Sequence, residues 1–389
     1  MPGSESSKRP IYLNTAYSFE ERAADLVSRM TPEEKQSLLG NSMAAIPRLG
    51  VNAYNVWGEA LHGVVGMFNP NAGAATSFPS SASLGSAWDP ALMERETSVI
   101  SEEARGFNST VISNLTYWSP VVEPVRDPRW GRTGESFGED PFLISQIGGG
   151  FVRGMMGYDP VYLKSVPCGK HYFANNSEFN RHISSSDMDD RDMREFYLAP
   201  YRKLIEKDKL PGIMTAYNAV NGVLMSASRY YVDTIARKTF GLNGYVTGDC
   251  SAIEDIETGH LYAKTGAEAT AMGLKPGVDT DCGSYYQKNA AILRMADIIK
   301  DNNTLFLKFE KKGSLYSASC SSDGKNFKTI GTAELMLKDV KAGMIVCNGA
   351  PMARSGNFPA MPGMQQPSEP DTPFEVSYDY FRIINKGLK

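Results

Sequence analysis

The sequence predicts an α/β protein: a (β/α)8 barrel of the TIM type, followed by a smaller, all-β, sandwich-like domain. Three observations lead to this prediction. From about residue 50, short apolar or β-branched runs alternate with helical stretches. Near residue 288 this alternation stops, and apolar residues then recur with a period of two. The 389 residues suffice for a barrel of roughly 250 residues and a second domain.

Composition and charge exclude several classes of protein. Hydrophobic residues make up 42% of the chain and charged residues 22%, which is ordinary globular usage. Because 40 basic residues stand against 44 acidic ones, no basic excess is available for binding nucleic acid. No run approaches the roughly 18 apolar residues of a membrane span, and Met1–Pro10 lacks the apolar core of a secretory signal. We therefore expect no nucleic-acid partner, no membrane partner and no signal peptide in this chain.

The cysteines and histidines do not form a metal-binding pattern. The chain has 5 cysteines without a CxxC pair, and none of its 4 histidines lies in an HExxH segment. The glycine run Gly148–Gly150 is followed by Gly154, which misses the GxGxxG spacing of a phosphate-binding loop. We therefore expect no metal and no other cofactor.

Two capping boxes near the N-terminus predict short helices. Ser18 precedes Glu21 by three residues, and Thr31 precedes Glu34 by three residues. These are structural signals without chemistry, and they follow an N-terminal tail that we place at residues 1–15.

The barrel domain is expected at residues 16–287, where strand–helix alternation indicates a parallel sheet covered by helices. The expected strands are Ala53–Val56, Ser77–Leu84, Tyr117–Val122, Ser165–Cys168, Gly212–Ala216, Tyr245–Thr247 and Val278–Thr280. The expected helices are Pro90–Gly106, Leu143–Met156, Asp190–Lys207, Tyr230–Thr239 and Gly266–Met272. The number of these units favours a closed barrel, and an open doubly wound sheet is the alternative.

The second domain is expected at residues 304–389, after a connecting helix and linker at residues 288–303. Its expected strands are Leu305–Phe309, Leu315–Cys320, Phe327–Ile330, Met344–Cys347 and Phe374–Ile384, with a long loop over Ala350–Thr372.

Candidate catalytic groups lie where barrel strands end and loops begin, because that face of such a barrel carries the active site. Asp249 follows the strand Tyr245–Thr247 and is expected to point into the mouth of the barrel. The alternative is that Asp249 caps a helix that starts at Ser251. Tyr217 follows the preceding strand and is either a hydroxyl donor to a neighbouring carboxylate or a rim residue with a buried ring.

Cationic side chains and a further carboxylate follow other expected strands. Lys170 and His171 supply donors for sugar hydroxyls, and a solvated loop lysine is the alternative for Lys170. Arg132 is either a fork for substrate or part of a salt-bridged loop, and Glu59 lies just past the first strand. The charged cluster around Arg132 comprises Glu123, Arg126, Asp127, Arg129, Arg132, Glu135, Glu139 and Asp140. Together these groups suit a polyhydroxylated substrate.

At these residues the chain resembles glycoside hydrolase family 3, and the matching segments occur in the family's order over roughly residues 16–287. They are GEALHG (58–63), RDPRWGRTGESFGEDP (126–141), KHYFANN (170–176), NR (180–181), DDRDMREFYLAPY (189–201), MTAYNAVNG (214–222), TGDCSAI (247–253) and GVDTDCG (277–283). The resemblance implies a (β/α)8-type first domain, in agreement with the strand–helix alternation.

The resemblance also implies a retaining, exo-acting β-glycosidase. Asp249 is then the nucleophile that forms a glycosyl-enzyme, and Tyr217 holds it. The residues implied to line the subsite for the non-reducing-end sugar are Glu59, Arg132, Lys170, His171, Arg181 and Met214. Glu59 and Cys250 stand where glucosidases of the family carry Asp and Trp, which favours β-xylosides over β-glucosides, with arabinosides as a side activity. The implied partner is a plant cell-wall oligosaccharide or an aryl glycoside.

The second half of the chain departs from the family pattern. The family's acid/base glutamate comes from an α/β sandwich domain that should begin soon after GVDTDCG, whereas a helix and an unrelated β segment follow here. That segment resembles concanavalin- or laminin-G-like modules, on YSASCSSDGKNFKTIG (316–331) and FEVSYDYFRI (374–383). We expect an internally shortened enzyme without an assignable acid/base, whose intact relatives are secreted or periplasmic. A carbohydrate-binding or catalytically impaired remnant is the alternative.

Three geometric expectations follow. Asp249 is expected to be ionised at neutral pH and to face Lys170, His171 and Arg132 across one pocket, since nearby cations favour the carboxylate. None of the tail's acidic residues is expected within the roughly 5–5.5 Å of Asp249 that retaining chemistry requires. Those acidic residues are Asp323, Glu334, Asp339, Glu369, Asp371 and Glu375.

The third expectation concerns two cysteines. Cys250 and Cys282 are expected to lie close together because both follow neighbouring barrel strands, and two free thiols are the alternative to a disulfide.

Overall fold

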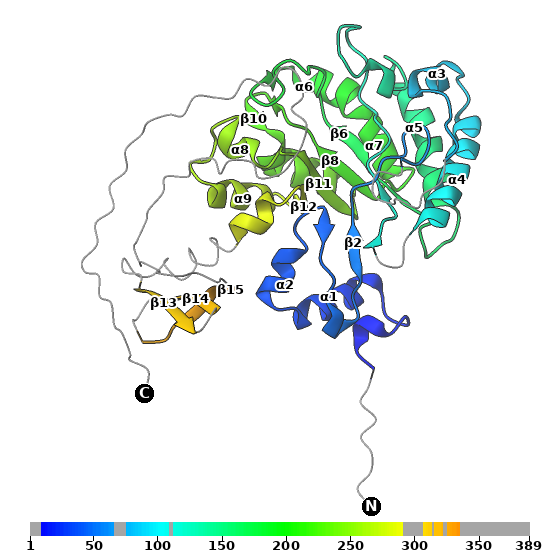
Figure 1. Ribbon diagram of the computed structural model, residues 1–389. Helices are drawn as coiled ribbons and strands as arrows, with labels where there is room; N and C mark the ends of the chain where they lie inside the picture. Colours follow the sequence, from blue (N-terminus) through cyan, green and yellow to red (C-terminus); the bar gives the residue numbers. More distant parts are fainter. Residues whose placement is uncertain are drawn as a thin grey trace, which may run out of the picture. The chain divides into compact units, whose positions relative to one another are not determined.

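The computed structural model describes residues 9–65, 75–108, 112–290, 306–312, 315–321 and 325–334 (Figure 1). The chain divides into two compact units. One unit comprises residues 1–306 and 321–326, and the other comprises residues 307–320 and 327–389. The first unit carries the candidate site.

Both N-terminal capping boxes form as the sequence predicts. They begin helices α1 (Phe19–Arg29) and α2 (Pro32–Ser37). The backbone N–H of Glu21 donates to Ser18 Oγ at 3.2 Å, and the glutamate side chain accepts from the Ser18 N–H at 2.9 Å. These reciprocal bonds satisfy backbone donors that a helix start leaves unpaired.

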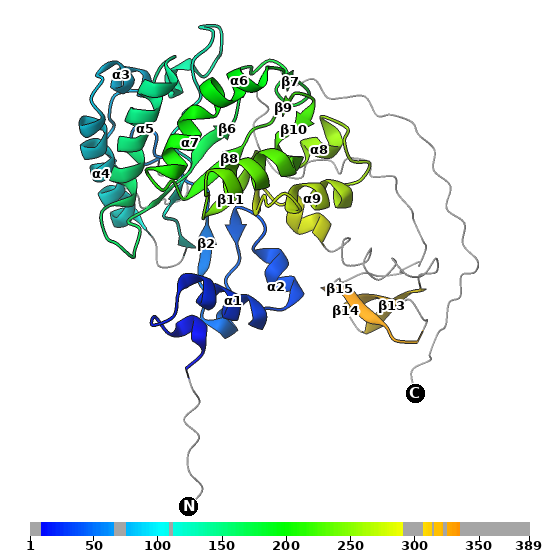
Figure 2. The ribbon, with the colours of Figure 1, turned by 180° about the vertical axis from the view of Figure 1, so that it is seen from behind.

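In the described part of the first unit, paired strands and strands that follow each other directly in the chain together form a ring, of which Figures 1 and 2 show the central strands β6, β8 and β11. Its strands are β1 (Ser42–Met43), β2 (Ala53–Asn55), β3 (Ile112–Ser113), β4 (Thr116–Tyr117), β5 (Val166–Pro167), β6 (Gly169–Tyr172), β8 (Gly212–Thr215), β11 (Tyr245–Cys250) and β12 (Thr280–Cys282). The central sheet is parallel, in the order β12-β11-β8-β6, and β4 pairs in parallel with β5 as β2 does with β3. A parallel bridge between Gly40 and Asp281 joins the remaining edges.

The ring is an α/β barrel-type arrangement rather than the open sheet that was the alternative. It is not wholly parallel, because β1 runs antiparallel to β2. The wholly parallel barrel expected from the sequence is therefore wrong at this pair. The short segment between β1 and β2 turns through η2 (Pro47–Leu49), which leaves no room for the crossover helix that parallel neighbours need.

The predicted helices are present with small shifts at their ends, except that the helix expected at Asp190–Lys207 is divided into three helical segments. The α-helices of the barrel unit after α2 are α3 (Ser81–Ser86), α4 (Pro90–Phe107), α5 (Pro141–Met156), α6 (Asp190–Asp192), α7 (Ala199–Glu206), α8 (Asp255–Thr258) and α9 (Gly266–Leu274). The π-helical segments are η4 (Met193–Tyr197) and η6 (Tyr230–Thr239), and the remaining short 3-10 turns are η1 (Ile11–Leu13), η3 (Thr133–Glu135) and η5 (Met225–Ala227).

One expected strand is a helix. The range Ser77–Leu84 was expected to be extended, but α3 occupies Ser81–Ser86. Its sequence SASLGS lacks the β-branched and aromatic residues that favour a strand. Gly85 lets this helix approach the Phe137 carbonyl oxygen, where an added Cβ would lie only 2.0 Å away.

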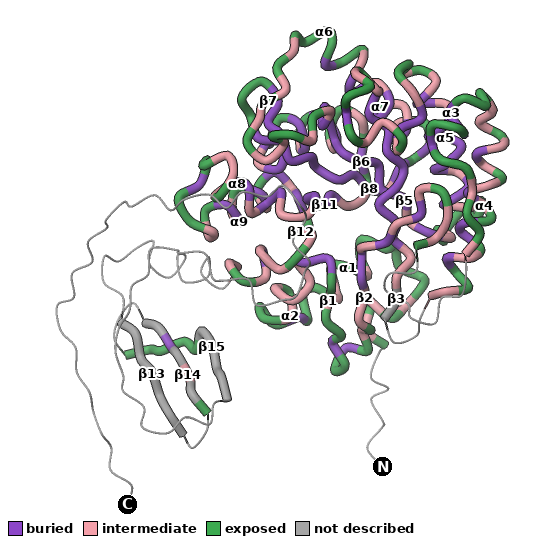
Figure 3. The backbone as a smooth tube through the Cα atoms, turned by 45° about the horizontal axis from the view of Figure 1, so that its top comes forward, coloured by how far each residue is buried: buried purple, intermediate pink, exposed green. Residues whose placement is uncertain are grey.

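The glycine run of α5 serves helix packing. An added Cβ on Gly150 would lie 2.3 Å from the Pro90 carbonyl oxygen, and one on Gly154 would lie 2.1 Å from Thr97 Oγ1. The run therefore lets α4 and α5 pack closely, side by side (Figure 1). Figure 3 shows that the buried residues concentrate along β6, β8 and β11 and on the helices that cover them.

A small mixed sheet forms from the loops that follow β6 and β8. It consists of β7 (Ser185–Ser186), β9 (Ala219–Val220) and β10 (Val223–Leu224), in the order β10-β9-β7. This sheet ties together the loops on the face of the barrel to which the strands' carboxyl ends point.

In the second unit the described residues form one three-stranded sheet, in the order β13-β14-β15. The strands are β13 (Phe306–Lys312), β14 (Leu315–Ser321) and β15 (Lys328–Glu334), of which β14 and β15 are antiparallel. The other expected features of the tail lie outside the described residues: strands Met344–Cys347 and Phe374–Ile384, the loop Ala350–Thr372, residues 291–300 of the connecting helix, and the acidic residues Asp323, Asp339, Glu369, Asp371 and Glu375. None of the described helices has the length and hydropathy of a membrane-spanning segment.

Candidate active site

The expected site residues gather at the carboxyl ends of β6, β8 and β11. Lys170 and His171 lie inside β6, and Asp249 lies inside β11, rather than beyond the strand ends as expected. β6 runs further than the sequence predicts because Lys170 pairs with a neighbouring segment. Its N–H donates to the Pro120 carbonyl at 3.0 Å, and its carbonyl accepts from the Val122 N–H at 3.1 Å.

Asp249 is a buried carboxyl with one incompletely used oxygen. Its side chain accepts the N–H of Cys250 through Oδ1 at 2.7 Å, whereas Oδ2 is buried without a hydrogen bond. Burial raises the pKa of Asp249, although the Cys250 N–H and the charges of Lys170 and Arg132 oppose the rise. The net direction is therefore opposite to what nearby cations alone would produce.

Asp249 is not a helix cap. Residues 251–254 form a turn, and the next helix, α8, begins only at Asp255. The alternative that Asp249 caps a helix starting at Ser251 is therefore wrong.

The imidazole of His171 lies between Arg132 and Asp249. Arg132 Nη1 is 2.8 Å from His171 Nε2, and the same ring nitrogen is 3.5 Å from Asp249 Oδ2. Arg132 also pairs with Glu135 at 2.6 Å, so it belongs both to a salt-bridged loop and to the site. Burial lowers the pKa of His171 well below its usual range, and the charges of Arg132 and Lys170 lower it further, which keeps the ring neutral.

Lys170 and Glu59 form an ion pair beside this group. Lys170 Nζ lies 2.8 and 3.0 Å from the two carboxylate oxygens of Glu59, and the lysine side chain is 7% exposed. Lys170 is therefore not a solvated loop lysine. Burial raises the pKa of Glu59 even though Lys170 opposes the rise.

Tyr217 is held from three directions. The Arg181 guanidinium lies 4.3 Å from its ring centroid, the His182 ring is 4.5 Å away, and His260 Nε2 donates to its carbonyl oxygen at 2.9 Å. Burial and the negative charge of Asp249 raise the pKa of Tyr217, so the phenol stays protonated and can donate. Tyr217 therefore has the buried ring of the second alternative, and its hydroxyl is close enough to Asp249 for the negative charge to raise the pKa of the phenol.

Met214 lies in β8 and is 1% exposed. It packs with Val56, Trp118 and Cys168 in a small apolar cluster. Its side chain is therefore buried among apolar neighbours.

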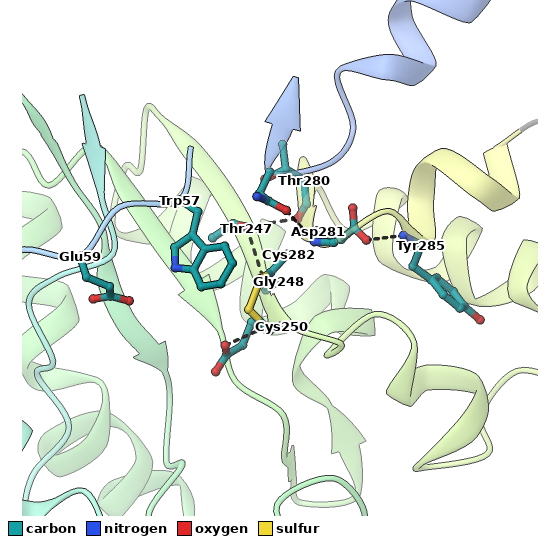
Figure 4. Close-up of a disulfide and its surroundings, with 12 residues drawn as sticks. Trp57, Glu59, Thr247, Gly248, Cys250, Thr280, Asp281, Cys282 and Tyr285 are labelled. Carbon is teal, nitrogen blue, oxygen red and sulfur yellow. Dashed lines mark hydrogen bonds between the residues drawn. A yellow bond between two sulfur atoms is a disulfide. The ribbon is translucent and has the colours of Figure 1, made fainter. Parts of the chain in front are cut away.

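Cys250 and Cys282 lie close together, as expected, and form a disulfide with a Cα–Cα distance of 4.4 Å (Figure 4). The alternative of two free thiols is not what the structure contains. The disulfide joins β11 to β12 directly after Asp249. Beside it lies the indole of Trp57, which stacks on Trp118 with ring centroids 5.7 Å apart, and Glu59 projects from the same segment as Trp57 (Figure 4).

Sequence reasoning placed Glu123 in the charged cluster but gave it no role. The structure buries its side chain completely and directs it at His171 and Asn175. Burial raises the pKa of Glu123 well above its usual range, while the N–H groups of these two residues oppose the rise. The sequence holds no signal for this contact, because the partners are 48 residues apart.

The described residues contain no group of three His, Cys, Asp or Glu side chains that could hold a metal ion.

Residues 40–304 match the family model described as the glycosyl hydrolase family 3 N terminal domain. The exo-1,4-β-xylosidase bxlB of Emericella nidulans is 41% identical over 292 residues, which cover 72% of this chain and 38% of that protein. The probable β-D-xylosidase 7 of Arabidopsis thaliana is 38% identical, over 74% of this chain and 40% of that protein. The chain thus spans about two fifths of the length of these two relatives.

Solved structures share the arrangement. A GH3 exo-β-xylosidase (XlnD) in complex with a xylobiose aziridine probe is 33% identical, with a TM-score of 0.70 over 73% of this chain and 38% of that chain. The β-glucosidase 3B of Thermotoga neapolitana, in complex with glucose, has a TM-score of 0.58 at 24% identity, over 72% of this chain and 39% of that chain. The second likeness is one of fold alone.

Proposed function

The chain belongs to glycosyl hydrolase family 3, and from that premise we propose that it is a retaining β-glycosidase with Asp249 as its nucleophile. The observation that supports this proposal best is Asp249 Oδ2, a buried carboxylate oxygen without a hydrogen bond. Such an oxygen can attack an anomeric carbon without first leaving a hydrogen-bonded partner. The charges of Arg132, Lys170 and Arg181 act on Asp249 and favour its ionised form against the effect of burial.

The proposed reaction has two steps. In the first step a bond forms between Asp249 Oδ2 and the anomeric carbon while the bond to the leaving group breaks; an aryl leaving group departs as its anion, and the alcohol of a disaccharide takes a proton from solvent. In the second step water attacks the same carbon, gives up a proton to solvent, and releases the sugar and the carboxylate. We assign to the protonated hydroxyl of Tyr217 the role of holding Asp249 between the two steps.

The proposed substrate class is β-xylosides. Lys170 fixes the Glu59 carboxylate, and in this proposal that carboxylate crowds the place where a hexose would carry its C6 group. The relatives named as xylosidases, at 41% and 38% identity, support the same choice. β-Glucosides are the second choice, arabinosides are a side activity, and the remaining subsite roles go to Arg132, His171, Arg181 and Met214.

No general acid is assigned within the described residues, and this sets the expected substrate profile. A good leaving group departs without protonation, whereas the alcohol of a natural disaccharide needs a proton. We therefore expect an aryl β-xyloside to react and xylobiose to react on the order of 10²–10⁴-fold more slowly than in an enzyme with its acid in place.

The second candidate is a carbohydrate-binding or catalytically impaired form of such an enzyme. The same Glu59–Lys170 pair and Arg132 that support catalysis also suit hydroxyl binding. This candidate predicts xylobiose binding without any turnover of an activated substrate.

Covalent trapping tests the proposal. An activated 2-deoxy-2-fluoro-β-xyloside should add one sugar mass to the protein, on the peptide that contains Asp249, and Asp249→Asn should abolish the adduct. The Asp208→Asn variant should form the same adduct as the parent, because Asp208 is a buried carboxyl that pairs with Arg153 of α5 and Lys203 of α7. An adduct on another carboxyl would overturn the assignment of Asp249, and xylobiose binding without any adduct would favour the second candidate.

A further inference from the structure

Glu123 is a buried carboxyl that the proposed mechanism does not use. None of its side chain is exposed, and it accepts three N–H contacts from the loop and strand that carry the site. Oε2 lies 2.9 Å from His171 Nδ1 and 3.2 Å from the His171 backbone N, and Oε1 lies 2.5 Å from the Asn175 backbone N. Both oxygens face backbone N–H groups, which only donate, so these contacts favour the ionised carboxylate against the rise in pKa that burial causes.

The proton on His171 can be placed by counting donors. Arg132 Nη1 lies 2.8 Å from His171 Nε2, and a guanidinium has donors only. Nε2 must therefore accept from Arg132, since an N–H on Nε2 would oppose the N–H of Arg132. A neutral imidazole carries one proton, so that proton sits on Nδ1, where Glu123 Oε2 accepts it.

This placement determines what His171 shows to Asp249. Nε2 lies 3.5 Å from Asp249 Oδ2, but without a proton it has nothing to donate to that oxygen. The lone pair of Nε2 instead accepts from Arg132 and holds that guanidinium in place. His171 was expected from the sequence to be a donor, and the proton count makes its side chain an acceptor.

We propose that Glu123 is a positioning residue that holds His171 in the Nδ1-protonated tautomer, so that Nε2 acts as a hydrogen-bond acceptor and leaves Asp249 Oδ2 free. The tautomer is a property of the folded chain and does not depend on turnover. Only the catalytic consequence rests on the proposed function: Asp249 Oδ2 accepts no hydrogen bond from His171 and stays free to attack.

Replacing Glu123 by Gln should reverse the tautomer. A glutamine amide keeps the volume and can turn its NH2 group toward Nδ1, which would then accept. The imidazole proton would move to Nε2 and donate to Asp249 Oδ2, and Arg132 would have to turn away from Nε2, because two N–H groups cannot face each other. Glu123→Asp keeps the carboxylate and should keep the proton on Nδ1, although with a longer contact.

Nitrogen NMR of protein labelled with ¹⁵N-histidine measures this directly, because the chain has only 4 histidines and each tautomer has its own pair of ring-nitrogen shifts. We expect the Nδ1-protonated pattern for His171 in the parent protein and in Glu123→Asp, and the reversed pattern in Glu123→Gln. The Asp208→Asn variant, a buried carboxyl that contacts Arg153 and Lys203 instead, controls for general loss of stability and should leave the His171 signals unchanged.

A parent protein with its His171 proton on Nε2 would overturn the inference, as would an unchanged pattern in Glu123→Gln. If Glu123→Gln does not fold, the parent spectrum and the Glu123→Asp variant still decide.

Kinetics on an aryl β-xyloside then test the consequence for Asp249. Partners that orient a metal-bound imidazole typically contribute about 10–100-fold, and we take the same order of magnitude for His171. We expect Glu123→Gln to lower kcat by that factor with a smaller change in KM, and Glu123→Asp to recover part of it. An inactive parent with the expected tautomer would count against the proposed function and not against the role of Glu123, whereas an active Glu123→Gln variant with unchanged kcat would remove the catalytic consequence.

Discussion

Two buried carboxylates, Asp249 at the strand ends and Asp208 on the helical side, are held in opposite ways. Asp208 pairs with Arg153 Nη1 at 2.6 Å and with Lys203 Nζ at 2.7 Å, so each of its oxygens faces a cation. Within the described part of the chain, Asp249 has no lysine or arginine at ion-pair distance, and the ring nitrogen at 3.5 Å belongs to the neutral His171.

This difference in pairing distinguishes a carboxylate that stabilises the fold from a carboxylate that can react. A buried carboxylate whose two oxygens both have partners recovers much of the solvation free energy that it loses on burial. An incompletely paired carboxylate does not recover it, so its pKa rises and its ionised form weakens the fold. The helical side connects α4, α5 and α7 through a completed network that includes Glu94 on Arg153 at 2.7 Å. The strand ends leave an oxygen of Asp249 unused, which is what covalent chemistry needs.

The largest expected effect is on catalysis at the unpaired carboxylate. Asp249→Asn should lower kcat on an aryl β-xyloside by about 10⁴-fold or more, because the amide cannot form the glycosyl-enzyme. Asp208→Asn, measured per folded molecule, should leave kcat unchanged. Steady-state kinetics test this, with the folding of both variants checked by circular dichroism. Equal losses of kcat in the two variants would show that Asp249 has no special catalytic role.

The second effect concerns the disulfide that joins the ends of β11 and β12 beside Asp249. Cys250 and Cys282 are 32 residues apart in sequence, and a loop of that length corresponds to about 3–4 kcal/mol of stabilisation in the chain-entropy account. The Cys250→Ser/Cys282→Ser double variant should lose about that much free energy of unfolding in urea. Dithiothreitol should lower the Tm of the parent but not of the double variant, and an unchanged parent Tm would contradict the assignment.

Asp281 extends the comparison to a third carboxyl. It is 3% exposed, Oδ1 is buried without a hydrogen bond, and Oδ2 accepts the Tyr285 N–H at 2.7 Å. Burial raises the pKa of Asp281 from 3.8 to about 6, so its stability contribution is complete below about pH 4 and is lost as pH rises through 6.

The free energy of unfolding of the parent should therefore fall by roughly 3 kcal/mol between pH 4 and 7 on account of this group. Asp281→Asn keeps an acceptor for the Tyr285 N–H and cannot ionise. It should equal the parent near pH 4 and exceed it near pH 7 in urea titrations. A difference between the two proteins that does not change with pH would show that Asp281 has an ordinary pKa.

The smallest expected effect is on stability, and it has opposite signs in Asp208→Asn and Asp249→Asn. Asp208→Asn should lower the free energy of unfolding by about 1–2 kcal/mol, a value reduced because Arg153 and Lys203 both reach solvent. Asp249→Asn should raise the Tm at neutral pH, since burial raises the pKa of Asp249 and the neutral amide avoids an ionised group. Shifts of the same sign in both variants would show that the two carboxylates are held alike.

Much of the local structure was predictable from the sequence. The capping boxes at Ser18 and Thr31, and the helices α4 and α5, depend on residues three or four positions apart, and all four formed as expected. The strand assigned to Ser77–Leu84 failed, because a short apolar run carries no period that distinguishes a strand from a buried helix.

The sequence by itself determined which chemical groups are available near the strand ends and which helices cover the sheet, because periodicity and caps act over one or two turns. Only the tertiary structure decided which groups meet. Lys170 and Glu59 are 111 residues apart and His171 and Glu123 are 48 apart, so their contacts follow from strand register and ring closure. The protonation of His171 and the unused oxygen of Asp249 depend on those contacts, and for that reason no local pattern in the sequence contains them.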